Sequence, residues 1–250
     1  MASSPVISRS LIDAVVFDMD GVVTQTASVH AAAWAALFDA FMQERAQRTG
    51  EPYAPFTQQD YLQYVDGKPR EAGVRDFLAS RGVAVPEGSP SDGPEAESVY
   101  GLGARKNGYF LQAVRDHGVH AYQGTLDLIA ALHAAGIHTA IISASKNTTA
   151  ILEAAGVRAL FEAQVDGEIA ADLRLPGKPD PAVFLEAARR VGVPPPRAVV
   201  CEDAIAGVEA GHAGGFGLVI GVDRGGNAAA LAANGADVVV SDLSEVEVRP

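Results

Sequence analysis

Short apolar runs alternate with amphipathic segments over most of the chain. The apolar runs that predict β-strands are residues 14–17, 137–143, 163–165, 198–203, 218–223 and 236–240. Apolar residues between these runs recur at helical spacing and predict helices over residues 125–135, 148–155, 181–191, 204–213 and 228–234. Strands that are apolar almost throughout and alternate with helices are typical of a parallel sheet with helices on both faces. The pattern therefore predicts an α/β fold with a doubly wound parallel sheet.

A long stretch after the first strand departs from this alternation. Residues 27–118 show helical patterns, over residues 28–47, 70–80 and 95–115, and no convincing strand. The sequence VPEGSPSDGPE, at residues 85–95, is rich in Pro, Gly and Ser and predicts an exposed loop. We therefore expect a core domain formed by residues 1–26 and 119–250, with a small inserted α-helical domain formed by residues 27–118.

The composition excludes several classes of protein. A net charge of −12 argues against a surface that binds nucleic acid or anionic membranes. The apolar runs are too short to span a bilayer, and the N-terminal residues lack the basic and apolar regions of a secretory signal. The single cysteine, Cys201, excludes an intramolecular disulfide and is typical of the reducing cytoplasm. We expect a cytoplasmic protein that needs local cations to bind an anionic substrate.

Two aspartates follow the first predicted strand, in the sequence VVFDMDGVVTQT. Because the side chains of a strand alternate between its faces, Asp18 and Asp20 lie on the same face. Two carboxylates this close repel each other unless a cation joins them or one takes a proton. The motif alone also fits two solvated acids at a turn, because short motifs occur by chance.

Further polar residues follow three later strands of the predicted sheet. They are Ser143, Ser145, Lys146, Asn147, Lys178, Glu202 and Asp203. Each cluster alone could simply cap a helix. Ligands of such sheets bind at the carboxyl ends of the strands, however, so these clusters meet the two aspartates at one edge. Carboxylates there can hold a hard divalent cation, while hydroxyls, lysines and helix N-termini can bind a phosphoryl group.

The segments DMDGVVT, IISAS, GKPDP and CEDA, in this order, resemble the four signature motifs of the haloacid dehalogenase (HAD) superfamily. The likeness covers essentially the whole chain, and the helical insertion is similar to the cap domain of the β-phosphoglucomutase-like family. The resemblance implies Mg²⁺-dependent phosphoryl transfer on a small sugar phosphate, through an aspartyl-phosphate. Within this family it implies conversion of β-glucose 1-phosphate to glucose 6-phosphate. We expect a monomer without nucleic-acid or membrane partners.

The resemblance also implies roles for the core residues. Asp18 would be the nucleophile, and Asp20 the general acid and base. Mg²⁺ would be bound by Asp18, the backbone carbonyl of Asp20 and Asp203, with Glu202 in the same acidic cluster. The side chains that would bind the transferring phosphoryl group are Ser143 and Lys178.

Substrate specificity would come from the insertion and from one core loop. His30 resembles the histidine that organises the general acid, and Arg70 resembles a cap arginine that binds the second phosphate of the substrate. Lys106 and Asn107 resemble residues facing the sugar and the hinge. The core half of the second-phosphate site would consist of Ser145, Lys146 and Asn147. From the residues alone, a lone histidine at position 30 is more often a helix-surface residue, and Arg70 also fits a solvated arginine at the start of a helix.

Two other enzymatic functions fit all or part of this set of residues. A sugar-phosphate phosphatase would share the first half of the reaction and use water as the acceptor. A metal-dependent glycosyltransferase would use the Asp-x-Asp motif to bind Mn²⁺ and a sugar nucleotide, but it has no need of Ser143, Lys178 and the Glu202–Asp203 pair. A non-catalytic regulatory module would have little reason to retain every reactive group. A sugar phosphomutase is therefore the leading hypothesis.

Overall fold

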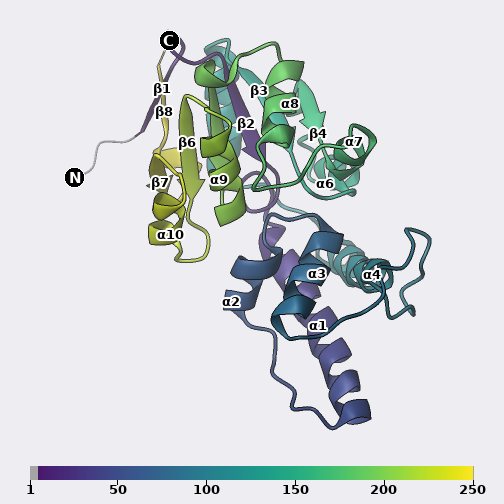
Figure 1. Cartoon of the computed structure of the whole chain (residues 1–250). Helices are drawn as coiled ribbons and strands as arrows, with labels where there is room; N and C mark the ends of the chain where they lie inside the picture. Colours follow the sequence, from purple (N-terminus) through teal and green to yellow (C-terminus); the bar gives the residue numbers. More distant parts are fainter. Residues whose placement is uncertain (1–4, 250) are drawn as a thin grey trace. The chain divides into compact units, whose positions relative to one another are not determined.

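The computed structural model describes residues 5–249, so residues 1–4 and 250 of the predicted core domain lie outside the described part. The chain divides into two compact units (Figure 1). The first comprises Met1–Gln25 and Val119–Pro250, and the second comprises Thr26–Gly118. Among residues 5–249, no helix combines the length and apolar character needed to cross a lipid bilayer.

The first unit is built on a six-stranded parallel sheet with the strand order β4-β3-β2-β5-β6-β7. Its strands are β2 (Ala14–Asp18), β3 (His138–Ile142), β4 (Ala163–Val165), β5 (Ala198–Glu202), β6 (Leu218–Val222) and β7 (Val238–Val240). The chain adds β3 and β4 on one side of β2 and then continues with β5 on the other side. The order of the strands thus reverses at β2, where α/β sheets bind ligands. The predicted α/β fold with a parallel sheet is confirmed.

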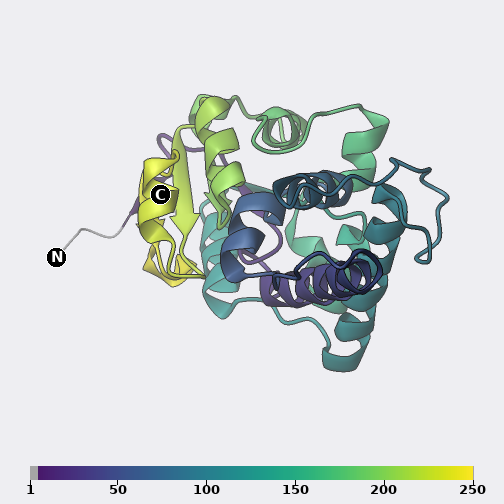
Figure 2. The same cartoon turned by 60° about the horizontal axis from the view of Figure 1, so that its bottom comes forward.

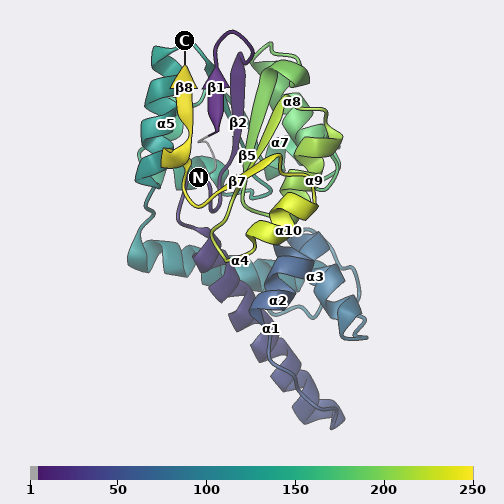
Figure 3. The ribbon, with the colours of Figure 1, turned by 90° about the vertical axis from the view of Figure 1, so that its left-hand side faces the viewer.

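Helices cover both faces of this sheet. They are α5 (Gln123–Ala134), α6 (Thr148–Ala154), α7 (Gly167–Asp172), α8 (Ala182–Arg190), α9 (Ile205–Ala213) and α10 (Ala228–Ala233). Helix α8 packs across β2, β3 and β4, α9 packs on β5 and β6, and α5 packs on β3. Figure 3 shows α5 on one side of the sheet and α8 and α9 on the other. In α8, Phe184, Ala187 and Ala188 form one buried face, which is why this segment folds as a helix against the sheet.

Two strands and one α-helix of the first unit were not predicted from the sequence. The strands β1 (Val6–Ser8) and β8 (Glu247–Arg249) form a separate parallel pair, and β8 packs on α5 (Figure 3). Helix α7 begins where Asp166 accepts hydrogen bonds from the backbone N–H groups of Glu168 and Ile169. Both strands are partly exposed and α7 has no buried residue, so none of the three shows the apolar pattern that marks the other elements.

The second unit contains helices and no strand between residues 26 and 118. The helices are α1 (Ala27–Thr49), α2 (Gln58–Asp60), the π-helix η1 (Tyr61–Val65), α3 (Arg70–Ser80) and α4 (Val99–His117). Helix α1 packs on α4, and α3 packs on α4 and η1 (Figure 2). Aromatic rings fill the core between α1 and α3, with Phe38 stacked on Trp34 at 5.1 Å and close to Phe77 at 4.0 Å.

Two details of this unit differ from the sequence-based expectation. Helix α4 begins at Val99 instead of residue 95, because Ser98 caps it by accepting a hydrogen bond from the Gly101 N–H at 3.1 Å. The segment that forms α2 and η1 was not predicted as helical. It starts with a capping box in which the side chains of Thr57 and Asp60 each accept a hydrogen bond from the other residue's backbone N–H.

Candidate active site

Three carboxylates converge at the carboxyl edge of the sheet. Asp18 is the last residue of β2, Glu202 is the last residue of β5, and Asp203 follows it. One oxygen from each of these three side chains lies within 4.8 Å of the others. Within residues 5–249, they are the one group of at least three side chains arranged to hold a metal ion. Carboxylate oxygens are ligands for hard divalent cations, so this group fits such an ion.

A buried lysine lies among these acids. The Lys178 side chain is 3% exposed, and its Nζ donates a hydrogen bond to Asp18 Oδ1 at 2.5 Å and another to Glu202. Burial disfavours the charged ammonium, but the negative charges of Asp18 and Glu202 outweigh this and hold the pKa of Lys178 above its usual value. Lys178 therefore remains positively charged.

One lysine does not balance the surrounding negative charge. Burial and then the charge of Glu202 raise the pKa of Asp18 well above its ordinary range, and attraction by Lys178 offsets this only in part. The carboxylates thus lack positive charge, which a divalent cation would supply. They fit a cation site in charge as well as in arrangement.

Asp20 lies beside Asp18 in a different environment. Its backbone N–H donates to Asp18 Oδ2 at 2.9 Å, and its own Oδ2 accepts a hydrogen bond from Ser143 Oγ at 3.3 Å. Lys178 and the Asp20 N–H together hold both oxygens of Asp18. The Asp20 carboxylate does not belong to the group of three clustered acids. A metal contact from Asp20 would therefore have to come from its backbone carbonyl oxygen.

Two glycines allow the backbone to approach these acids closely. Gly21, which has a left-handed φ of 85°, turns the chain away from β2. A Cβ at Gly21 would lie 1.8 Å from Asp203 Oδ2. A Cβ at Gly207, in α9, would lie 1.7 Å from Glu202 Oε1. The acidic group is therefore packed directly against backbone at both positions.

Arg224 is a site residue that the sequence analysis missed. Its Nε donates to the carbonyl oxygen of Gly21 at 2.8 Å, and its guanidinium lies 3.6 Å from the centroid of the Tyr122 ring. Its Nη1 donates to Ser241 O and to Asp242 Oδ2, both at 3.1 Å. Arg224 thus braces the turn that follows the two aspartates. Its position directly after the predicted strand 218–223, at the same edge of the sheet, was the available signal.

The loop after β3 brings four predicted phosphate-binding residues into one turn. Ser143 Oγ accepts a hydrogen bond from the Ser145 N–H at 3.0 Å, and Ser145 Oγ accepts one from the Asn147 N–H at 3.1 Å. Lys146, between them, is exposed. The serine hydroxyls therefore shape the turn, which lies at the same edge as Asp18.

The four predicted residues of the second unit form two contacting pairs. Lys106, 3% exposed, places its Nζ 2.5 Å from His30 Nδ1 and 5.0 Å from the ring centroids of Trp34 and Phe110. The lysine can only donate, so His30 Nδ1 accepts and the proton of the neutral ring is on Nε2.

The second pair is Arg70 and Asn107, and Asn107 lies on helix α4, as Lys106 of the first pair does. Arg70 Nη2 donates to Asn107 Oδ1 at 2.9 Å, and Asn107 follows Lys106 in the chain. Burial holds the pKa of Arg70 below its usual value. The structure therefore brings the predicted residues of this unit together around the middle of α4.

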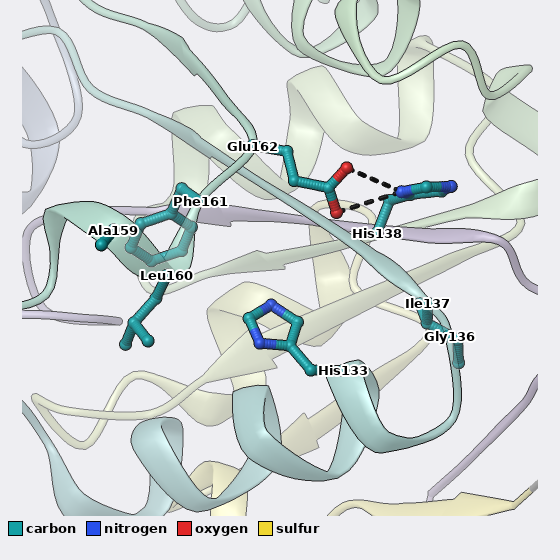
Figure 4. A pocket seen from close by; sticks show the side chains of 8 residues that line it. All are labelled: His133, Gly136, Ile137, His138, Ala159, Leu160, Phe161 and Glu162. Atoms are coloured by element: carbon teal, nitrogen blue, oxygen red, sulfur yellow. Dashed lines mark hydrogen bonds and ion pairs between the residues drawn. The ribbon is translucent and has the colours of Figure 1, made fainter.

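A separate pocket of about 450 Å³ lies at the opposite edge of the sheet (Figure 4). His138, the first residue of β3, places its Nδ1 3.0 and 2.8 Å from the two carboxylate oxygens of Glu162, which directly precedes β4. The pocket also contains His133. None of the predicted site residues lines this pocket, so it is not part of the site at the carboxyl edge.

Comparisons with known proteins agree with this arrangement. A family model described as a haloacid dehalogenase-like hydrolase matches residues 12–215. A β-phosphoglucomutase of Mycobacterium bovis is 48% identical over 239 residues, which cover 94% of this chain and 91% of that protein. An uncharacterized glycosyl hydrolase of Mycobacterium tuberculosis is 41% identical over 98% of this chain but only 18% of its own length. The crystal structure of a Clostridium difficile β-phosphoglucomutase has the same fold, with a TM-score of 0.72, 24% identity, and coverage of 94% of this chain and 93% of that one.

Proposed function

The chain belongs to the haloacid dehalogenase-like hydrolase family, and on this basis we propose that it is a β-phosphoglucomutase, which converts β-glucose 1-phosphate into glucose 6-phosphate. The observation that carries the proposal is the 48% identity to a β-phosphoglucomutase over 94% of this chain and 91% of that protein. A match over nearly the full length of both chains favours the mutase over the phosphatase. The test is to measure both products, glucose 6-phosphate and inorganic phosphate, on one sample.

The proposed cofactor is Mg²⁺, held by Asp18, Asp203 and the backbone carbonyl of Asp20, with Glu202 in the same cluster. The buried, clustered carboxylates and the raised pKa of Asp18 support this assignment. When bound, Mg²⁺ supplies positive charge that reduces the repulsion between a carboxylate and a phosphate.

In the proposed reaction, Asp18 attacks the phosphorus of a sugar bisphosphate. A bond forms between an Asp18 oxygen and phosphorus while the bond from phosphorus to the sugar oxygen breaks, and Asp20 gives its proton to that oxygen. Lys178 and Ser143 bind oxygens of the transferring group and stabilise its charge. In the second half, Asp20 takes a proton from a hydroxyl of the sugar, which attacks phosphorus and releases Asp18.

A mutase must bind a sugar phosphate in either orientation, so it needs a second phosphate site. We assign Ser145, Lys146 and Asn147, in the turn after β3, to this role. Arg70 in the second unit is assigned to the same phosphate, because it is a cation held in place by Asn107. His30 and Lys106 complete the substrate-binding set. A monomeric state and a cytoplasmic location remain predictions from the sequence.

A further inference from the structure

The turn that holds Ser145 is built against a second loop. The Ser143 N–H donates to the Val165 carbonyl at 3.2 Å, and the Gly167 N–H donates to the Ser145 carbonyl at 3.0 Å. The first bond extends the parallel pairing of β3 with the last residue of β4, and the second joins the two loops beyond the ends of both strands. The conformation of the Ser143–Asn147 turn therefore depends on residues 165–167.

The second bond requires a close approach at Gly167. A Cβ at this position would lie 2.6 Å from the Ala144 carbonyl oxygen and 3.1 Å from the Ser145 carbonyl carbon. Such distances are shorter than van der Waals contact, so a side chain here would force the two loops apart. The loop after β4 thus supports the turn directly, backbone against backbone.

Asp166 fixes this supporting loop. Asp166 is 5% exposed, and its Oδ1 accepts hydrogen bonds from Glu168 N–H at 3.1 Å and Ile169 N–H at 2.9 Å. These bonds anchor the first turn of α7 directly after Gly167. Its other oxygen, Oδ2, accepts a bond of 2.5 Å from Gln164 Nε2. Both oxygens of this buried carboxylate are therefore satisfied.

Gln164 links Asp166 to the other side of the turn. The Gln164 side chain is buried, and its Nε2 also donates to Thr149 Oγ1 at 2.9 Å. Thr149 is in the first turn of α6, which follows the Ser143–Asn147 turn. Gln164 Oε1 is buried and has no hydrogen-bond partner among residues 5–249. The amide cannot rotate to satisfy that oxygen, because Oε1 would then face the Asp166 carboxylate, acceptor against acceptor.

We propose that Gln164 and Asp166 are positioning residues for the second phosphate site. The amide of Gln164 holds the first turn of α6 and the first turn of α7 at a fixed separation, and the Ser143–Asn147 turn lies between these two anchors. Ser143 itself is tied to the end of β4, whereas the outer part of the turn, with Ser145 and Lys146, depends on the Gln164–Asp166 bond. This inference rests on the proposed function of that turn.

Two reactions of the protein depend on this network to different extents. Transfer of a phosphoryl group from acetyl phosphate to Asp18 needs Lys178 and Ser143 but no second phosphate site. Conversion of β-glucose 1-phosphate, primed with glucose 1,6-bisphosphate, needs Lys178 and Ser143 and also the second phosphate site. Loosening the turn therefore weakens binding of the sugar phosphate and leaves the chemical step largely intact.

The first test compares Gln164→Leu with wild type. We expect the KM for β-glucose 1-phosphate to rise about tenfold and kcat to stay within about threefold. The rate at which acetyl phosphate phosphorylates Asp18 should stay within about twofold. Gln123→Leu is the matched control, because Gln123 is exposed at the start of α5 and makes its bond to Asp127 at 2.8 Å on the surface. Its kinetics should match wild type.

A pair of changes tests the bond itself. Gln164→Glu sets a carboxylate against Asp166 and should raise the KM at least as much as Gln164→Leu. Adding Asp166→Asn restores a donor–acceptor pair with the polarity reversed, and the KM should return to within about threefold of wild type. If Gln164→Leu does not fold, the surface variant Thr149→Val removes only the bond to α6 and should raise the KM about threefold.

Three results would overturn the inference. The first is an unchanged KM in Gln164→Leu. The second is a Gln164→Leu protein in which the KM rises while kcat and the reactivity with acetyl phosphate fall to the same extent. The third is a rise in KM in Gln164→Glu that Asp166→Asn does not relieve. Failure of the proposed function is a separate outcome. If the wild-type protein releases phosphate instead of isomerising the sugar, the mutase proposal fails. The KM of Gln164→Leu for the sugar phosphate, measured by phosphate release and compared with that of wild type, still tests the positioning role.

Discussion

Lys178 Nζ lies 2.5 Å from Asp18 Oδ1, and the same buried ammonium also contacts Glu202. Asp18 thus shares its one buried cation with a second acid. This arrangement keeps the carboxylate oriented, with its other oxygen bonded to the Asp20 N–H at 2.9 Å. Burial and then the charge of Glu202 raise the pKa of Asp18, and the lysine offsets this only in part. The geometry is that of an oriented carboxylate, which we propose as the nucleophile, beside acids that fit a cation.

The first prediction concerns this nucleophile. In the presence of Mg²⁺, acetyl phosphate should add one phosphoryl group to the wild-type protein and none to Asp18→Asn, as measured by intact mass. Turnover of the sugar phosphate should fall on the order of 10⁴-fold or more in that variant. Asp20→Asn is the control: it should still form the adduct, because acetate leaves without a general acid. A phosphorylated Asp18→Asn protein would disprove the assignment.

The second prediction concerns the backbone turn beside the proposed cation site. Gly21→Ala combines a left-handed φ with a Cβ placed 1.8 Å from Asp203 Oδ2. We expect it to lower stability by about 1–3 kcal/mol and Mg²⁺ affinity at least about tenfold. Titration calorimetry with Mg²⁺ and thermal unfolding measure the two effects. Gly225→Ala is the matched control, since a Cβ there meets nothing within 4 Å. Equal Mg²⁺ affinity in both variants would contradict the placement of the Mg²⁺ site beside Gly21.

The third prediction separates the two phosphate sites. Arg70→Ala and Lys146→Ala should each raise the KM for sugar phosphates about tenfold or more, because each removes a cation that we propose to bind the second phosphate. Acetyl phosphate has no second phosphate, so its reaction with Asp18 should be nearly unchanged. Lys178→Ala should impair both reactions. The same kinetic profile for Arg70→Ala and Lys178→Ala would rule out separate sites.

The fourth prediction concerns pH and stability away from the site. Arg197 Nη2 donates a hydrogen bond to Asp13 Oδ1 at 2.9 Å. Hydrogen bonding to Arg197 is the main cause that lowers the pKa of Asp13 to about 2 from an ordinary value of 3.8. A group with a lowered folded-state pKa stabilises the protein above its ordinary pKa and loses this contribution as the pH falls. The stability difference between wild type and Asp13→Asn should therefore be full at pH 6 and disappear between about pH 4 and pH 2. Urea unfolding across this range measures it. A constant difference would show that the ion pair does not contribute.

Much of the fold could be predicted because the strands are buried on both faces. Val15, Val16 and Val200 are inaccessible to solvent, so the sequence shows unbroken apolar runs where the central strands lie. The short pair β1 and β8 could not be predicted, because both strands are partly exposed, β8 has no apolar run, and the two strands lie at opposite ends of the chain.

The site was predictable to the extent that its residues directly follow strands. Asp18, Ser143 and Glu202 each stand at a strand end, and parallel topology alone brings such positions to one edge. Arg224 and Gln164 were missed for different reasons. Arg224 acts on a backbone carbonyl, and Gln164 acts through Asp166, and neither contact leaves a motif in the sequence.

The most direct test of the central claim is a pair of coupled assays on one sample. Wild-type protein receives β-glucose 1-phosphate, Mg²⁺ and a trace of glucose 1,6-bisphosphate, and glucose 6-phosphate and inorganic phosphate are followed together. A mutase must hold the phosphoryl group on Asp18 until a sugar hydroxyl accepts it, so we predict that glucose 6-phosphate forms faster than phosphate is released. Release of phosphate that outpaces isomerisation, for this sugar and across a panel of hexose phosphates, would contradict the account and identify the protein as a phosphatase.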